Sequence, residues 1–186
     1  MKRLFDLAIG SILCLVALVP ATVVAIVVAL TSKGPIIHWS ERVGKDNQLF
    51  QMPKFRTMLL GTPVVATHQL DNPASFLSPV GRVLRRSSLD EIPQLWCILR
   101  GEMSFVGPRP ALSNQVDLIA LRTSSGVYTL VPGLTGWAQI NGRDDLSLLA
   151  KAELDHEYLE RASLTFDMKI LLLTLVKVIK GSGVSH

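Results

Sequence analysis

The sequence predicts an α+β protein that is mainly helical, with an apolar N-terminal helix, one short β-hairpin and several amphipathic helices. Residues 7–30 hold no charged side chain, which predicts the first helix. Short runs at residues 36–39 and 49–52 flank a polar turn at residues 44–47, the pattern of a hairpin. Apolar residues recur at helical spacing further on. At 186 residues, the chain is long enough for one domain with its own core.

The composition favours a membrane setting. Hydrophobic residues make up 48% of the chain and charged residues only 18%, against about 25% charged in a typical soluble domain. The net charge of +4 suits anionic lipids or phosphate-rich substrates. Nucleic acid is not an expected partner, because the basic residues are spread singly and aromatic residues are few. Cys14 and Cys97 are the two cysteines, which we expect to be free thiols in a reducing cytoplasm.

The N-terminal apolar stretch is long enough to cross a bilayer, for which about 20 residues suffice. Pro20 lies near its middle, where proline removes a helical hydrogen bond and bends the axis. Lys2 and Arg3 precede the stretch and Lys33 follows it, so the positive charges indicate no orientation. A straight span and a re-entrant helix that enters and leaves on one face both fit these observations.

The elements after the hairpin are mostly helices separated by Gly/Pro loops. Residues 61–79 predict a loop, and residues 80–86 a helical turn. Apolar residues at i, i+3, i+4 and i+7 predict an amphipathic helix that ends at a glycine; these are Ile92, Leu95, Trp96 and Leu99, followed by Gly101. Further helices are expected at residues 114–122, 146–161 and 164–180. The last of these is either a helix lying in the membrane interface or a buried core helix.

Residues 85–93 combine arginines, serines and an acidic pair, and two interpretations of them are compatible. Ser88 and Glu91 match a capping box at the start of a helix. Alternatively, Asp90 is a carboxylate nucleophile beside the metal-binding carboxylate of Glu91, and Arg85 contacts a phosphate. No Walker A motif is present, so the sequence does not support an ATPase.

Other cations are placed where an anionic substrate would need them. Lys54 and Arg56 flank an aromatic residue after the second strand, either as outward charges on a sheet edge or as anion ligands. Arg109 stands between two prolines that stiffen its loop, and Arg143 follows a turn at Asn-Gly. Arginine binds phosphate oxygens with a planar fork and stays charged. Together with the acidic pair, these residues suggest chemistry on a phosphate.

Five segments occur in the order and approximate spacing of a known family, and they extend over nearly the whole chain. They are Lys54-Phe55-Arg56-Thr57-Met58, Ser88-Leu89-Asp90-Glu91-Ile92-Pro93-Gln94-Leu95, Gly107-Pro108-Arg109-Pro110, Pro132-Gly133-Leu134-Thr135-Gly136-Trp137 and Asn141-Gly142-Arg143. Each motif alone is weak, but their joint occurrence in order is specific. The chain resembles the bacterial sugar transferases, in the small form of the monotopic polyprenyl-phosphate phosphoglycosyl transferases.

The resemblance implies an enzyme, a phosphoglycosyl transferase. It would transfer a phospho-sugar from a UDP-sugar to polyprenyl (undecaprenyl) phosphate and release UMP, in the first membrane step of glycoconjugate biosynthesis. Asp90 would be the nucleophile that holds the phospho-sugar, and Glu91, with Asp90, would bind Mg²⁺. The phosphates would be bound by Arg85, Arg109, Lys54, Arg56 and Arg143.

The resemblance also implies a fold and a location. Residues 1–33 would form a re-entrant membrane helix broken at Pro20, and residues 34–186 a catalytic domain of short hairpin, helical core and interfacial amphipathic helices, the whole being a single domain. The family breaks this helix at a Ser-Pro pair, where this chain has Val19 and Pro20. The protein would lie at the cytoplasmic face of the bacterial inner membrane, in contact with membrane lipid. Association into a homo-oligomer stays open.

Two other classes of function compete with this interpretation. A non-catalytic, membrane-anchored lipid-binding scaffold predicts that Asp90 and Glu91 only cap a helix. A nucleotidyl transferase acting on soluble substrates leaves the apolar ends of the chain unexplained.

Overall fold

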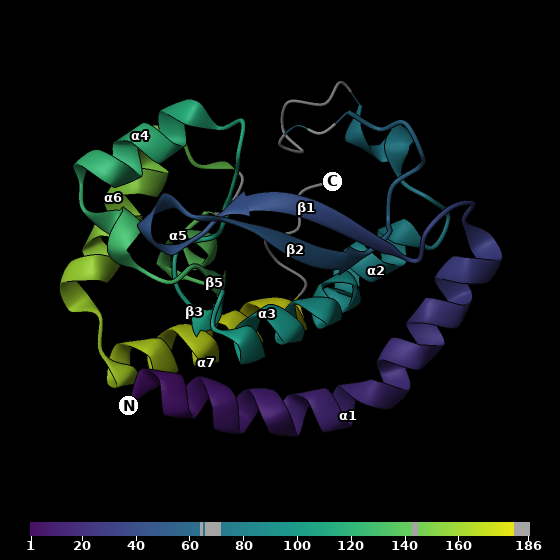
Figure 1. Ribbon diagram of the computed structural model, residues 1–186, viewed down its shortest axis with the longest axis horizontal. Helices are drawn as coiled ribbons and strands as arrows, with labels where there is room; N and C mark the ends of the chain where they lie inside the picture. Colours follow the sequence, from purple (N-terminus) through teal and green to yellow (C-terminus); the bar gives the residue numbers. More distant parts are fainter. Residues whose placement is uncertain (64, 66–71, 143–144, 181–186) are drawn as a thin grey trace.

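Helices dominate the computed structural model, which describes residues 1–63, 65, 72–142 and 145–180 (Figure 1). The α-helices are α1 (Lys2–Thr31), α2 (Gly81–Ser87), α3 (Leu95–Arg100), α4 (Val116–Ser124), α5 (Trp137–Ile140), α6 (Leu148–Arg161) and α7 (Leu164–Lys180). Short 3₁₀ helices are η1 (Lys45–Asn47), η3 (Pro73–Phe76), η4 (Leu89–Gln94) and η5 (Val127–Thr129). The strands are β1 (Ile37–Val43), β2 (Leu49–Phe55), β3 (Ser104–Val106), β4 (Ala111–Leu112) and β5 (Gly133–Thr135).

Helix α1 is continuous through Pro20 and changes direction about halfway along its length (Figure 1). A proline inside a helix bends the axis because its ring displaces the preceding turn. The Thr22 hydroxyl donates to the Leu18 carbonyl at 2.8 Å, so a hydroxyl accompanies the proline although Val19 replaces the serine that the family has. The predicted break is therefore a bend inside one helix of 30 residues.

Helix α1 is the one helix in the described part of the chain that is long and apolar enough to cross a membrane. Most of its apolar side chains point away from the protein; Leu15 is 77% exposed and Leu30 is 82% exposed. Water does not favour such a surface, and contiguous apolar patches of this kind are typical of membrane contact.

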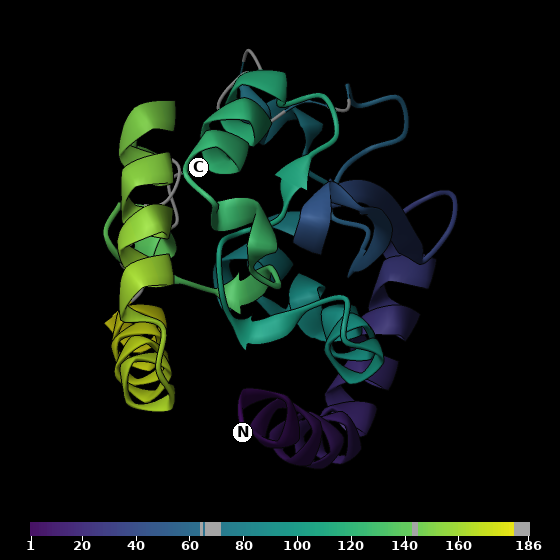
Figure 2. The same ribbon diagram turned by 60° about the vertical axis from the view of Figure 1, so that its left-hand side comes forward.

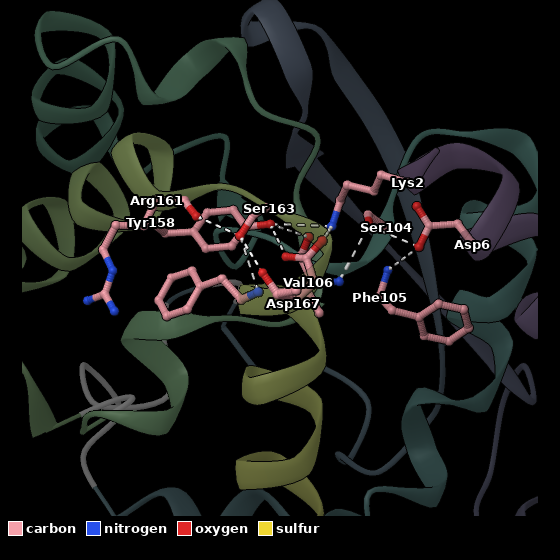
Figure 3. Close-up of polar contacts among 11 residues, drawn as sticks. Lys2, Asp6, Ser104, Phe105, Val106, Tyr158, Arg161, Ser163 and Asp167 are labelled. Atoms are coloured by element: carbon pink, nitrogen blue, oxygen red, sulfur yellow. Dashed lines mark hydrogen bonds and ion pairs between the residues drawn. The ribbon is translucent and has the colours of Figure 1, made fainter.

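Both ends of α1 are bonded to the rest of the protein. At the N-terminal end, Arg3 donates to the carbonyls of Ile98 and Leu99 at 2.5 and 2.6 Å. Asp6, 4% exposed, accepts hydrogen bonds from the Ser104 hydroxyl and the Phe105 amide (Figure 3). The helix of 30 residues thus begins and ends against one body.

The Lys2 ammonium completes the attachment at the N-terminal end of α1. It lies 2.5 Å from Asp167 Oδ2, in α7 (Figure 3). The hydroxyl of Tyr158, in α6, donates to Asp167 Oδ1 at 2.6 Å. The first turn of α1 is therefore tied to both C-terminal helices.

The predicted hairpin is confirmed and is longer than expected. Strands β1 and β2 are antiparallel, and Ile37 pairs with Phe55 while Val43 pairs with Leu49. A third strand, β4, adds to the other side of β1. Strands β3 and β5 form a separate parallel pair, which brings two distant Gly/Pro loops side by side.

The hydrophobic core is continuous with α1. The main cluster includes Ile98, Met103 and Ile170, and Phe5 and Ile9 of α1 pack against it. A second cluster joins Val24 and Val28 of α1 to Phe55 and Leu84. Figure 2 shows α6 and α7 along one side, α1 along another, and the strands with α3 between them. Because α1 shares its core with the other elements, it is part of the folded body.

The capping-box prediction at Ser88 and Glu91 is wrong. Ser88 has φ 57° and ψ 16°, so it ends α2 in the left-handed region, and its side chain caps no amide of η4. A capping residue needs extended backbone angles to reach the amides of the first turn. The chain from Leu89 to Gln94 is a 3₁₀ turn, and the predicted α-helix begins only at Leu95. Its stop at Gly101, with φ 85°, is confirmed.

Trp96 also differs from the prediction for this stretch, because it is exposed. The helical spacing placed it on the buried face with Leu95, yet it is 55% exposed, while Cys97 is fully buried. The 3₁₀ turn before α3 winds more tightly than an α-helix, and this rotates the buried face by about one residue.

Candidate active site

The acidic pair lies in the first turn of η4, in a partly buried cluster of cations. Asp90 is 6% exposed. The Glu91 side chain is 13% exposed, and its Oε1 lies 2.7 Å from Lys54 Nζ and 3.2 Å from Arg109 Nη2. The Glu91 carboxylate, which does not cap a helix, therefore bridges two cations from separate parts of the chain.

The first of these cations, Lys54, comes from the hairpin. Lys54 is near the end of β2, and β2 packs closely against η4. Arg85, in the last turn of α2, donates from Nε to the Thr57 hydroxyl at 3.0 Å, and its charge acts on Asp90. The structure thus brings Lys54, Arg85 and Arg109 together around the acidic pair.

The loop that carries Arg109 lies against a second motif loop, residues 132–136. In the β3–β5 pair, Val106 is opposite Thr135, so residues 107–110 lie beside residues 132–136. A β-carbon on Gly133 would lie 2.1 Å from the Gly107 amide nitrogen, and one on Gly136 would lie 2.1 Å from the Gly107 carbonyl oxygen. Only glycine permits this approach of backbone to backbone, which explains the glycines of both motifs.

One predicted phosphate ligand, Arg56, does not join the cluster. Arg56 is 5% exposed, and its guanidinium donates to the Ser32 hydroxyl and to the carbonyls of Ser32 and Pro35. Because these carbonyls follow α1, we assign Arg56 a role in fixing the exit of α1 in place of the predicted phosphate contact. Arg143 lies outside the residues that the structure describes.

Arg42 is a cation near the site that the sequence did not single out. Its Nε donates to the Ser40 hydroxyl at 2.9 Å and its Nη1 donates to the Pro110 carbonyl at 3.2 Å. Burial and the nearby charge of Arg109 lower the pKa of Arg42 to about 10, while Glu91 opposes this shift. The available signal was the strand alternation, which places Arg42 on the same face as buried Ser40.

The surroundings of Asp90 act on the pKa of its carboxyl in two opposite directions. Burial raises the pKa of the Asp90 carboxyl above its ordinary value, and the negative charge of Glu91 acts in the same direction. The positive charges of Lys54, Arg85 and Arg109 lower it. A carboxylate that is poorly solvated and surrounded by cations is suited to attack an electrophile that brings negative charge with it.

A cavity of about 480 Å³ opens beside the acidic pair. Glu91 and Arg109 line it, together with Arg86 and Ser88. Apolar side chains of α1 and α7 also line it, among them Leu13, Val16, Ala17, Pro20, Leu171 and Val178, and α7 adds the cation Lys177. The cavity lining therefore combines charged and apolar side chains, which fits a ligand with an anionic head and a hydrocarbon chain.

The donor set at the acidic pair fits Mg²⁺. Asp90 and Glu91 are adjacent carboxylates, and Mg²⁺ prefers one or two carboxylates completed by substrate phosphates. No group of three or more acidic, histidine or cysteine side chains suited to a metal is found in the described part of the chain. A closed site built of protein ligands alone is thus not seen there, whereas a site shared with a diphosphate is compatible with these residues.

Comparisons with known proteins agree with the geometry. Residues 1–181 match the family described as bacterial sugar transferase. An undecaprenyl-phosphate glucose phosphotransferase of Komagataeibacter xylinus is 40% identical over 96% of this chain. A UDP-galactose-lipid carrier transferase of Erwinia amylovora is 35% identical over 98% of it.

The lengths of the relatives differ. The chain spans 36% of the Komagataeibacter relative and 41% of the Erwinia relative. An exopolysaccharide production protein of Sinorhizobium fredii is 37% identical, and the aligned region covers 98% of this chain and 87% of that protein. The match over nearly the whole sequence identifies the chain as a member of the bacterial sugar transferase family.

Proposed function

We propose that the protein transfers a phospho-sugar from a UDP-sugar to polyprenyl phosphate and releases UMP, as a membrane step in polysaccharide biosynthesis. The observation that carries the proposal is that one cavity is lined both by Glu91 and Arg109 and by apolar side chains of α1 and α7. A phosphate on a long hydrocarbon chain matches this combination. The names of the relatives make UDP-glucose and UDP-galactose the first donors to test.

In the first step, an Asp90 carboxylate oxygen attacks the phosphorus atom that bears the sugar. A new bond forms between that oxygen and phosphorus, and the bond to the bridging oxygen breaks, so that UMP leaves with the electron pair. Lys54, Arg85 and Arg109 surround Asp90 and stabilise the negative charge of the diphosphate. Glu91 holds Lys54 and Arg109 in place through its Oε1.

In the second step, an oxygen of polyprenyl phosphate attacks the same phosphorus. The acyl phosphate bond to Asp90 breaks, which restores the carboxylate and yields a polyprenyl diphospho-sugar. The apolar lining of the cavity from α1 and α7 binds the hydrocarbon chain and excludes water from the intermediate.

Mg²⁺ is the proposed cofactor, held by Asp90 and Glu91 together with oxygens of the diphosphate. When bound, it supplies Lewis acidity to the phosphoryl group and offsets the charge of the departing UMP.

We propose that α1 is re-entrant, at the cytoplasmic face of the bacterial inner membrane, with residues 34–186 as the catalytic part. Its length of 30 residues corresponds to about 45 Å, enough to cross a bilayer if it stood upright. Both ends, however, are bonded to one body, through Arg3 and Asp6 at the start and Ser32 at the exit. A bent helix that dips into one leaflet satisfies these contacts, because its two ends stay on one face.

Intact mass spectrometry tests the reaction. Enzyme mixed with a UDP-sugar and Mg²⁺, without lipid acceptor, should release one UMP and gain the mass of one phospho-sugar. Asp90→Asn should do neither. Asp117→Asn, an exposed acid at the start of α4, is the matched control and should behave as the original protein. Normal turnover by Asp90→Asn would exclude the nucleophile, and absence of any UMP release with a full panel of UDP-sugars would favour the lipid-binding scaffold.

Cysteine labelling tests the topology. In a variant whose native cysteines are replaced by serine, cysteines at positions 2 and 33 should both react from the cytoplasmic side. Labelling of position 2 from the periplasm would contradict the re-entrant helix and establish a straight span.

A further inference from the structure

Arg109 sits in a loop that is fixed through its carbonyl oxygens. The Pro108 carbonyl accepts from the Gly133 amide at 2.9 Å. The Arg109 carbonyl accepts from Arg122 Nη1 at 2.8 Å, and the Pro110 carbonyl accepts from Arg42 Nη1 at 3.2 Å. The two prolines have no amide hydrogen to donate. The three consecutive carbonyls bond the loop to Gly133, Arg122 and Arg42.

Arg122 reaches the loop from α4 and is itself held by α6. Its Nε and Nη2 lie 2.9 and 2.6 Å from Asp155 Oδ2, while its Nη1 is the group that bonds the Arg109 carbonyl. The Arg122 side chain is 11% exposed and that of Asp155 is 1% exposed. All three nitrogens of the Arg122 guanidinium therefore donate hydrogen bonds, Nε and Nη2 to Asp155 and Nη1 to the active-site loop.

This ion pair is poorly arranged as a source of stability. Asp155 Oδ1 is buried and accepts no hydrogen bond from the described residues. Burial of two charges costs more than their attraction returns unless all their polar atoms are satisfied. A hydrophobic pair of the same volume would stabilise the α4–α6 contact at least as well, but it could not donate to a backbone carbonyl.

We propose that Arg122, oriented by Asp155, is a positioning residue for the phosphate-binding arginine Arg109. The guanidinium of Arg122 fixes the position of the Arg109 backbone, from which the Arg109 side chain reaches Glu91 and the cavity. The inference rests on the proposed function, because it assigns to Arg109 the contact with the diphosphate. Arg122 does not itself line the cavity, and its contact with the site is through the Arg109 carbonyl.

A double-mutant cycle on the first half-reaction tests the proposal, with UMP release from UDP-sugar as the readout and thermal unfolding as the check on folding. Arg122→Lys keeps a charge for Asp155 but cannot bond Asp155 and the Arg109 carbonyl at once. We expect kcat/KM to fall about 10- to 100-fold, because an error of about 1 Å in a substrate-binding group costs up to about 100-fold. In an Arg109→Ala background, Arg122→Lys should cause no further loss.

The outcomes separate three cases. Equal multiplicative losses in both backgrounds, or a loss that follows only the unfolding temperature, would overturn the positioning role. Full activity of Arg109→Ala would instead remove the premise from the proposed function. Asp155→Asn, which leaves Arg122 without its orienting charge, should repeat the pattern of Arg122→Lys if that variant folds poorly. Arg161→Lys, in another ion pair of α6, with Glu157, is the matched control and should leave kcat/KM unchanged.

Discussion

At the scale of residues, the charge balance around Asp90 controls when its carboxyl is ionised. Burial and Glu91 raise its pKa, and Lys54 is the first of the cations that oppose them. Lys54 also lies 2.7 Å from Glu91, so it restrains both acids at once. Attack on phosphorus needs the ionised form of Asp90, and the rate therefore falls as the pH drops through the pKa of this group.

Lys54→Gln should move the acidic limb of the kcat/KM profile to higher pH. Removing a nearby positive charge destabilises the carboxylate, so the already raised pKa of Asp90 rises further. The measurement is the pH dependence of UMP release, with Lys45→Gln in the turn of the same hairpin as the control. An acidic limb that stays in place, or moves to lower pH, would show that Lys54 does not act on Asp90.

The sequence predicted a site that contains Asp90, Glu91, Lys54, Arg85 and Arg109, and the structure gathers these five side chains. It failed where the outcome depends on backbone angles or on distant partners. Ser88 has the right side chain for a cap, but it adopts left-handed angles. Arg56 carries the right charge, yet the carbonyls after α1 take it. Neither result can be obtained from local pattern, because both are decided by how α1 and α2 pack.

At the scale of elements, α1 is held by polar side chains in an otherwise apolar sequence. Asp6 is the most buried of these at the N-terminal end, and it bonds the start of β3, which leads into the loop of Arg109. The attachment of α1 and the position of the Arg109 loop are therefore connected through the three residues of β3. The bend at Pro20 was readable from the sequence, but the attachment of the helix ends was not, because the partner of Asp6 is 98 residues away and that of Ser32 is 24 residues away.

Asp6→Ala should lower the free energy of unfolding by about 1–3 kcal/mol, since two buried donors lose their acceptor. Thermal unfolding in lipid nanodiscs measures this, and Ser11→Ala on the exposed side of α1 is the control. Equal unfolding temperatures for Asp6→Ala and Ser11→Ala would show that Asp6 does not anchor the helix.

At the scale of the whole molecule, the two ends of the sequence build one cavity. Helix α1 and helix α7 each contribute apolar side chains to it, and its charged residues come from α2, η4, α7 and the loop of Arg109. The predicted helix at residues 164–180 is confirmed as α7. Its apolar residues are divided, some buried in the core, such as Ile170, and others exposed, such as Leu172. The sequence alone could not distinguish an interfacial helix from a core helix, because α7 has both a buried and an exposed apolar face.

Val178→Trp should impair the second half-reaction and spare the first. Val178 lines the cavity and is half exposed, so a larger ring fills space proposed for the hydrocarbon chain without disturbing the core. We expect KM for polyprenyl phosphate to rise about 10-fold, by loss of about 1.4 kcal/mol of binding, with the UMP burst unchanged. Val176→Trp, an equally exposed position of α7 that does not line the cavity, is the control. Equal effects of the two variants would contradict the assignment of the cavity to the lipid.

The polar attachment of α1 also has a consequence for the order of events during synthesis. Ribosomes make the N-terminal end first, so α1 is complete before Ser104, Phe105 and Asp167 exist. Until then its Asp6 and Lys2 have none of these partners, and the apolar helix can shelter only in lipid or against a chaperone. Helix α7 is synthesised after the other elements that line the cavity, so the nascent chain can complete this cavity only after residues 164–180 have been made.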